Sequence, residues 1–97
     1  MDKFVWIAVD ERSRGQCEEC GRNFPMKHHA FGGANREKME MVETVFDLCW
    51  EDHQGNKGVH FNRNKDLKYK QIATQNLLNL GWTKEQIIHE VGRWYLD

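Results

Sequence analysis

The 97-residue chain has no hydrophobic run that approaches the length of a membrane-spanning helix, which needs about 20 apolar residues. The apolar stretch Phe4–Val9 is too short for the core of a secretory signal peptide, and Asp10 and Glu11 follow it directly. The sequence also lacks internal repeats, low-complexity segments and linkers rich in proline, glycine or serine. These absences predict one small globular domain that has no contact with a membrane.

Cysteine is scarce, and the count of three is odd, which excludes a complete disulfide framework. Cys17 and Cys20 form a Cys-x-x-Cys pair, which in a cytosolic protein binds zinc or carries out redox chemistry. One interpretation is therefore a redox pair with a separate, buried Cys49. Because the pair does not lie in the strand–helix–strand setting of a thioredoxin site, zinc is favoured.

The chain also lacks an excess of charge of one sign, since its formal net charge is −1. The overall charge therefore does not predict a nucleic-acid-binding protein. The segment 57–70, however, has one acid, Asp66, and five bases: Lys57, Arg63, Lys65, Lys68 and Lys70. A phosphate backbone responds to such a local patch more than to the total charge, although a solvated helix face is the alternative.

The pattern of apolar residues predicts an α+β domain. Expected strands span residues 4–9, 24–30 and 44–48. The charged segment 10–16 predicts a loop, 34–43 a loop or a short helix, and 50–60 a short helix or turn broken by two glycines.

Two helices are expected in the C-terminal part of the chain. An amphipathic helix spans 66–80 and ends near Gly81, where glycine favours the left-handed conformation of a helix C-terminus. Thr83-Lys-Glu-Gln has the form of a capping box and opens a last helix that extends through Trp94 and Tyr95. The two helices are expected to pack on each other and on the strands.

The cysteines have the spacing of a zinc knuckle. In that arrangement two thiolates, here Cys17 and Cys20, sit on a tight turn, and the glycine that follows allows a positive φ. Cys49, at the end of the strand 44–48, supplies a third ligand. The fourth ligand remains open between Asp52, His53 and, less simply, His28.

Four of the five histidines lie close in sequence to this knuckle, at positions 28, 29, 53 and 60. His89, on the last helix, is expected to be structural. Adjacent residues on a regular strand point to opposite faces, so His28 and His29 would share one site only if the strand were distorted, which the nearby Gly32-Gly33 would allow. Three neutral imidazoles bound to a divalent metal, with a fourth as general base, would suit hydrolysis of a phosphodiester.

Three segments carry a resemblance to a known family. They are His28-His-Ala-Phe-Gly-Gly-Ala-Asn-Arg36, Leu48-Cys-Trp-Glu-Asp-His53 and Gly58-Val-His-Phe-Asn62. Over residues 17 to about 96, the chain resembles small phage-encoded HNH nucleases. The resemblance implies a ββα-metal core with a zinc knuckle, followed by the pair of C-terminal helices.

The resemblance also implies a role for each histidine. His29 matches the general base that activates water, and His28, His53 and His60 match ligands of the catalytic metal, which is Mg²⁺, Mn²⁺ or Zn²⁺. Structural Zn²⁺ would be held by Cys17, Cys20, Cys49 and a fourth residue. That residue is Asp52, where such proteins carry Cys or His, or else His53.

The expected activity is cleavage or nicking of DNA in the cytoplasm of a bacterial host. Arg36, Lys57, Arg63, Lys65 and Lys68 are the expected nucleic-acid contacts. Partners would be DNA and a phage or host replication or recombination protein, and a dimer would cut both strands most simply. The asparagine of the HNH name has no clear counterpart; Thr44, Asn35 and Asn62 are the nearest residues.

Two other functions fit the same residues. The first is a zinc-stabilised scaffold that binds DNA, or inhibits a host protein, without cleavage. The second is a protein–protein adaptor whose histidines pack in the core. The number of bound metal ions separates them, because a nuclease should bind a second divalent ion that a scaffold lacks.

Overall fold

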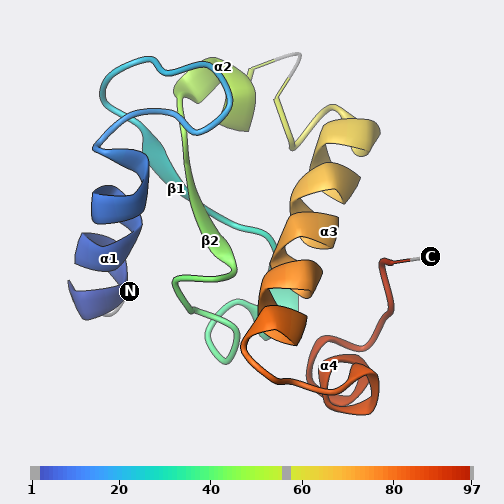
Figure 1. Cartoon of the computed structure of the whole chain (residues 1–97). Helices are drawn as coiled ribbons and strands as arrows, with labels where there is room; N and C mark the ends of the chain where they lie inside the picture. Colours follow the sequence, from blue (N-terminus) through green and yellow to red (C-terminus); the bar gives the residue numbers. More distant parts are fainter. Residues whose placement is uncertain (1–2, 56–57, 97) are drawn as a thin grey trace.

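The computed structural model describes residues 3–55 and 58–96. These residues form an α+β domain in which a two-stranded antiparallel sheet lies between α1 and α3 (Figure 1). The elements, in chain order, are α1 (Lys3–Ser13), β1 (Met26–His29), the 3₁₀ turn η1 (Gly33–Asn35), β2 (Val45–Leu48), α2 (Trp50–His53), α3 (Arg63–Asn79) and α4 (Lys84–Val91). In the described part of the chain, no helix is long and apolar enough to cross a membrane.

The first element differs from the prediction of a strand over 4–9 and a loop over 10–16, because Lys3–Ser13 forms a helix. A short apolar run does not by itself distinguish a strand from a helix. Here the run continues into Asp10-Glu-Arg12, and α1 buries only Val9, while Phe4 stays 79% exposed. A third strand would need a pairing partner, and in the described sheet β1 and β2 pair only with each other.

A buried lysine fastens α1 to the sheet. Lys27 Nζ, on β1, lies 2.7 Å from Asp10 Oδ1 and 2.7 Å from Asp47 Oδ1, and its side chain is 5% exposed. The Ser13 hydroxyl donates a 2.5 Å hydrogen bond to Asp47 Oδ2. Burial raises the pKa of Asp47, and Lys27 opposes that shift. The lysine therefore compensates the cost of burying a carboxylate under the helix.

The hairpin confirms the strands predicted over 24–30 and 44–48, although both are shorter than expected. Met26 pairs with Leu48, and His28 pairs with Phe46, so β1 stays in register through both histidines. All four residues of β2 are buried. The Phe46 ring lies 5.0 Å from that of Tyr69, which joins the sheet to α3. The core therefore spans the sheet and the C-terminal helices, as predicted.

Both C-terminal helices form, with corrected ends. The helix predicted over 66–80 begins at Arg63, because Asn62 accepts a hydrogen bond from the Lys65 backbone N–H. The capping box at Thr83 is confirmed. α4 ends at Val91, because Gly92 adopts a left-handed conformation with φ of 88°. Trp94 and Tyr95 therefore lie beyond the helix, in a segment that runs back alongside α3 (Figure 1).

Candidate metal centres

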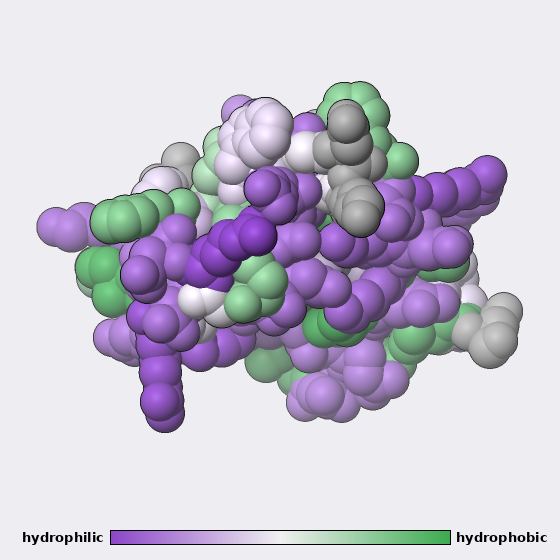
Figure 2. Space-filling model, turned by 90° about the horizontal axis from the view of Figure 1, so that it is seen from above, coloured by the Kyte–Doolittle hydropathy of each residue, from purple (hydrophilic) through white to green (hydrophobic). Residues whose placement is uncertain are grey.

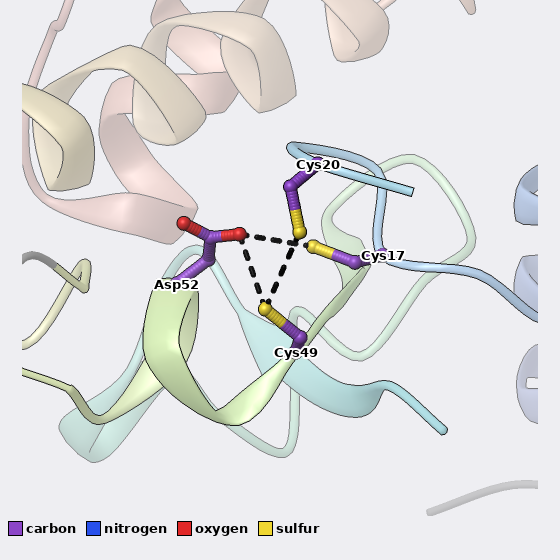
Figure 3. Close-up of side chains that lie close together, drawn as sticks. All are labelled: Cys17, Cys20, Cys49 and Asp52. Atoms are coloured by element: carbon purple, nitrogen blue, oxygen red, sulfur yellow. Dashed lines mark hydrogen bonds between the residues drawn. The ribbon is translucent and has the colours of Figure 1, made fainter. Parts of the chain in front are cut away.

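Three thiols and a carboxylate converge next to α2 and form the thiolate cluster, which consists of Cys17, Cys20, Cys49 and Asp52 (Figure 3). Cys17 Sγ and Cys49 Sγ lie 3.3 and 3.2 Å from Asp52 Oδ2, and Cys20 Sγ lies 3.5 Å from Cys49 Sγ. Ligands of a tetrahedral zinc ion lie about 3.5–3.8 Å from one another. The four donor atoms therefore already lie close to the spacing that zinc requires.

Two local features bring the thiols together. Gly21, directly after Cys20, has a φ of +81°, as the knuckle predicts, and its N–H donates to the Cys17 carbonyl. Cys49 is the N-cap of α2, at the end of β2, and Asp52 follows one helical turn later. A turn and a helix start thus each present two of the donors, and the fold brings the two pairs to one centre.

The charges of the thiolate cluster call for a cation. The Arg22 backbone N–H lowers the pKa of the Cys20 thiol, but Asp52, burial and the two other thiols raise it to about 12. Burial raises the pKa of Asp52, yet hydrogen bonds from the thiols and from Lys65 hold it below its usual range. Without a cation the Cys20 thiol keeps its proton next to the Asp52 carboxylate, and a bound metal ion would reverse this. A simple redox pair would not need Cys49 and Asp52 at the same point.

The thiolate cluster is also fastened to α3. Lys65 Nζ lies 3.1 Å from Asp52 Oδ1, the oxygen that faces away from the thiols. Glu19, inside the knuckle, accepts hydrogen bonds from Lys68 Nζ at 2.9 Å and from the Tyr69 hydroxyl. Lys65 and Lys68, predicted to contact nucleic acid, are therefore engaged in holding the knuckle against the helix.

Three imidazoles form a second group, the histidine cluster, which consists of His28, His53 and His60. One nitrogen from each ring lies within 4.8 Å of the others, and the Nε2 atoms of His53 and His60 are 3.0 Å apart. Among the described residues, His28 Nε2 and His53 Nδ1 are buried without a hydrogen-bond partner. A buried polar atom without a partner is costly, and a metal ion would satisfy the His28 nitrogen.

The environment keeps two rings of this cluster, those of His28 and His53, neutral. Burial, followed by the neighbouring imidazoles, lowers the pKa of His28 to about 3 and that of His53 to about 4. Neutral imidazole is the form that binds a metal ion. His28 and His53 are therefore in the form that binds a divalent cation at neutral pH.

The single turn of α2 separates the two clusters. Asp52 and His53 are adjacent, and adjacent helical residues point about 100° apart. Asp52 accordingly joins the thiols and His53 joins the imidazoles, so the structure places Asp52, rather than His53, as the fourth member of the thiolate cluster.

Gly58 allows the chain to return close enough for His60 to reach His53. A Cβ at this position would lie 2.7 Å from the Glu51 carbonyl oxygen and 2.8 Å from the His53 carbonyl carbon, so only glycine fits. Two residues later, the His60 N–H donates to the His53 carbonyl at 3.3 Å. The glycine that was predicted only to break a helix therefore positions a member of the histidine cluster.

His29 lies apart from the histidine cluster, because β1 is regular and the expected distortion does not occur. Its Nε2 lies 2.9 Å from Glu40 Oε1, and its side chain is 8% exposed. The hydrogen bond to His29 is the largest cause that lowers the pKa of Glu40. Residue His29 lines the hollow of about 470 Å³ that also contains His28 and His60, and it lines a second hollow together with Glu40, with which its ring pairs. His29 therefore borders the hollow of the histidine cluster, while its ring pairs with Glu40.

The residues near the place of the missing asparagine have other roles. The Thr44 hydroxyl donates to the Met39 carbonyl, Asn35 donates to the Val91 carbonyl, and Asn62 caps α3. The partner of His29 is instead Glu40, which sequence reasoning missed because no spacing relates the two residues.

The other predicted nucleic-acid contacts are dispersed. Arg36 is exposed on the wall of a second hollow, near Trp6, and Arg63 is exposed at the start of α3. Lys57 lies outside the described residues. Comparison of the chain with models of protein families, with curated proteins and with solved structures found no significant match. The interpretation of both clusters therefore depends on their own geometry.

Proposed function

We propose that the protein is a metal-dependent DNA endonuclease or nickase with a ββα-metal core of HNH type. The observation that carries this proposal is the histidine cluster. Three imidazoles from β1, α2 and the loop before α3 converge with a buried, unpartnered nitrogen, and residue His29 borders the same hollow. The thiolate cluster supports the proposal because a structural zinc ion there would fix the hairpin to α2.

His28, His53 and His60 would hold a divalent cation. Bound there, the cation would stabilise negative charge on a phosphate oxygen and on the leaving oxygen. The residue proposed to move a proton is His29. Because its Nε2 faces the Glu40 carboxylate, the favoured tautomer has its proton on Nε2, which leaves Nδ1 free to accept a proton from water. Glu40 would orient this tautomer, as the missing asparagine would otherwise do.

The surface around α2 suits a polar partner. Figure 2 shows that this face is mostly hydrophilic, with hydrophobic residues in separate small patches. A protein–protein adaptor that depends on a broad apolar interface would show a continuous hydrophobic area here. The face is therefore better suited to a nucleic acid than to an apolar protein partner.

The test is cleavage of supercoiled plasmid DNA by the purified protein with Mg²⁺, Mn²⁺ or Zn²⁺. We expect relaxed or linear plasmid from the wild-type protein and none from the double variant His28→Ala/His60→Ala, because the metal ligands are lost. His89→Ala removes an exposed imidazole on α4 and should cleave as the wild type does. A wild-type protein that is inert with every divalent metal would contradict the proposal.

A further inference from the structure

We propose that a groove between α3 and the C-terminal segment binds single-stranded nucleic acid and leads it to the histidine cluster. The α3–tail groove, as we call it, has a volume of about 410 Å³. It is lined by Arg63, Asp66, Leu67, Lys70 and Gln71 of α3 and by residues 93–96. Delivery of the strand to a nuclease site rests on the proposed function, whereas binding of the strand in the groove does not.

The two walls of the groove are fastened together. The segment after α4 runs back beside α3 (Figure 1), where Gln71 Nε2 donates a 3.0 Å hydrogen bond to the Tyr95 carbonyl. The side chain of Tyr95 is also held, because its ring stacks on the buried ring of Phe31, at 6.0 Å between centroids and 28° between planes. The groove is therefore preformed, which lowers the ordering cost of binding a ligand.

The charge of the groove suits phosphate. Three bases and one acid line it, and Lys70 Nζ pairs with the single acid, Asp66, at 2.6 Å. Arg63 and Arg93 are exposed, and neither forms an ion pair with another described residue. Two guanidinium groups thus remain for phosphate oxygens, which they bind through paired hydrogen bonds.

The basic side chains of α3 lie on two different faces of the helix, as the helical repeat requires. Lys65 and Lys68 lie three residues apart on the face that holds the knuckle, where they pair with Asp52 and Glu19. Arg63 and Lys70 are two turns apart on the face that lines the groove. The basic segment noted in the sequence therefore has one structural face and one face that is available to a ligand.

Aromatic residues favour a single strand over a duplex. Trp94 and Tyr95 line the groove and are half-buried. Lys84 Nζ lies 5.0 Å from the centre of the Trp94 ring, and Arg93 Cζ lies 6.0 Å from the centre of the Tyr95 ring, so a base stacked there would also meet a cation. Unpaired bases stack on such rings, whatever the base. The bases of a duplex are stacked inside it and do not reach a concave wall, so a duplex would use only the two arginines.

The groove joins the hollow of the histidine cluster. Asp66, Lys70 and Tyr95 line both, and the hollow also contains His29 and His60. A strand whose bases stack on the C-terminal segment would therefore place a neighbouring phosphate close to the imidazoles. This continuity gives the nuclease a substrate class, namely single-stranded nucleic acid or the unpaired end of a duplex.

The experiment measures fluorescence anisotropy of labelled oligo(dT) with the full-length protein and no added divalent metal, and the oligonucleotide is checked for integrity afterwards. We expect oligo(dT) to bind on the order of tenfold more tightly than a hairpin duplex of equal length. Trp94→Leu should weaken binding on the order of tenfold, because a stacked base is lost. Arg93→Gln should weaken binding and lower the slope of log affinity against log salt by about 0.7.

Lys3→Gln is the matched control, because it removes one exposed charge on α1 and should leave binding unchanged. Trp94 packs partly against the core, so circular dichroism must show that Trp94→Leu is folded. Arg93 is exposed, so Arg93→Gln tests the groove with a substitution that does not touch the core. Equal affinity for duplex, or wild-type binding by both groove variants, would overturn the proposal. If the protein binds oligo(dT) but cleaves neither plasmid nor single-stranded DNA with any divalent metal, only the nuclease is overturned. If the protein cleaves DNA and both groove variants bind as the wild type does, only the groove is overturned.

Discussion

Replacing Cys49 by serine should abolish the cooperative thermal unfolding transition of the protein or lower its midpoint by tens of degrees. Cys49 is buried, caps α2, and contacts both Cys20 and Asp52 in the thiolate cluster. Apparent binding energies of structural zinc in small domains are about 10–16 kcal/mol, and whole domains are stable by only about 5–15 kcal/mol. Loss of the ion would therefore remove most of the stability of a chain of this size.

Differential scanning calorimetry or circular dichroism measures this effect. Addition of a strong chelator to the wild-type protein should give the same result as the variant. His60→Ala removes an exposed member of the other cluster and should shift the midpoint by only a few degrees. If Cys49→Ser unfolds within a few degrees of the wild type and the chelator has no effect, the thiolate cluster does not hold a structural metal ion.

The second large effect is expected for His29→Ala, which should reduce plasmid cleavage about 10²- to 10⁴-fold, the usual contribution of a general base. The fold and the metal content should not change, because His29 lies outside the histidine cluster and its described hydrogen bond goes to Glu40. The rate of plasmid nicking under single-turnover conditions measures the loss, and element analysis measures the metal.

His28→Ala provides the contrast, since it should lose activity together with the second metal ion. A His29→Ala variant that cleaves at the wild-type rate would exclude His29 as the base. A variant that loses the second ion would make His29 a metal ligand rather than a base. Either result would require a different assignment of the two adjacent imidazoles.

The parts of the fold that the sequence predicted are those whose residues carry local signals. Thr83 and Gln86 cap a helix through contacts between neighbours in the chain, so the start of α4 follows from spacing alone. The same holds for the knuckle, where Gly21 follows Cys20 with the expected positive φ. Such features depend on a few adjacent residues and not on the rest of the fold.

The features that were missed depend on distant contacts. The helix α1 is set by Lys27, which lies 17 residues from Asp10 in the chain. Glu40 meets His29 only because the segment after η1 folds back along β1. The α3–tail groove exists because Gly92 ends α4 and returns the chain to Gln71. None of these contacts leaves a periodic pattern in the sequence.

The fourth member of the thiolate cluster shows which part of the site the sequence alone does not determine. Cys-x-x-Asp-His offers two adjacent donors, and both have the correct chemistry. The rotation between Asp52 and His53 on α2 separates them, and the position of His60 shows which cluster each one joins. Residue types therefore predicted that two metal centres would form, and three-dimensional packing assigned the members.

The most direct test of the account is the number of metal ions bound to each chain, measured by element analysis of the purified protein after dialysis against a divalent metal. We predict two ions for each wild-type chain and one for His28→Ala/His60→Ala, with the thiolate cluster still filled. A single ion in both proteins would contradict the second centre and leave only a zinc-stabilised scaffold.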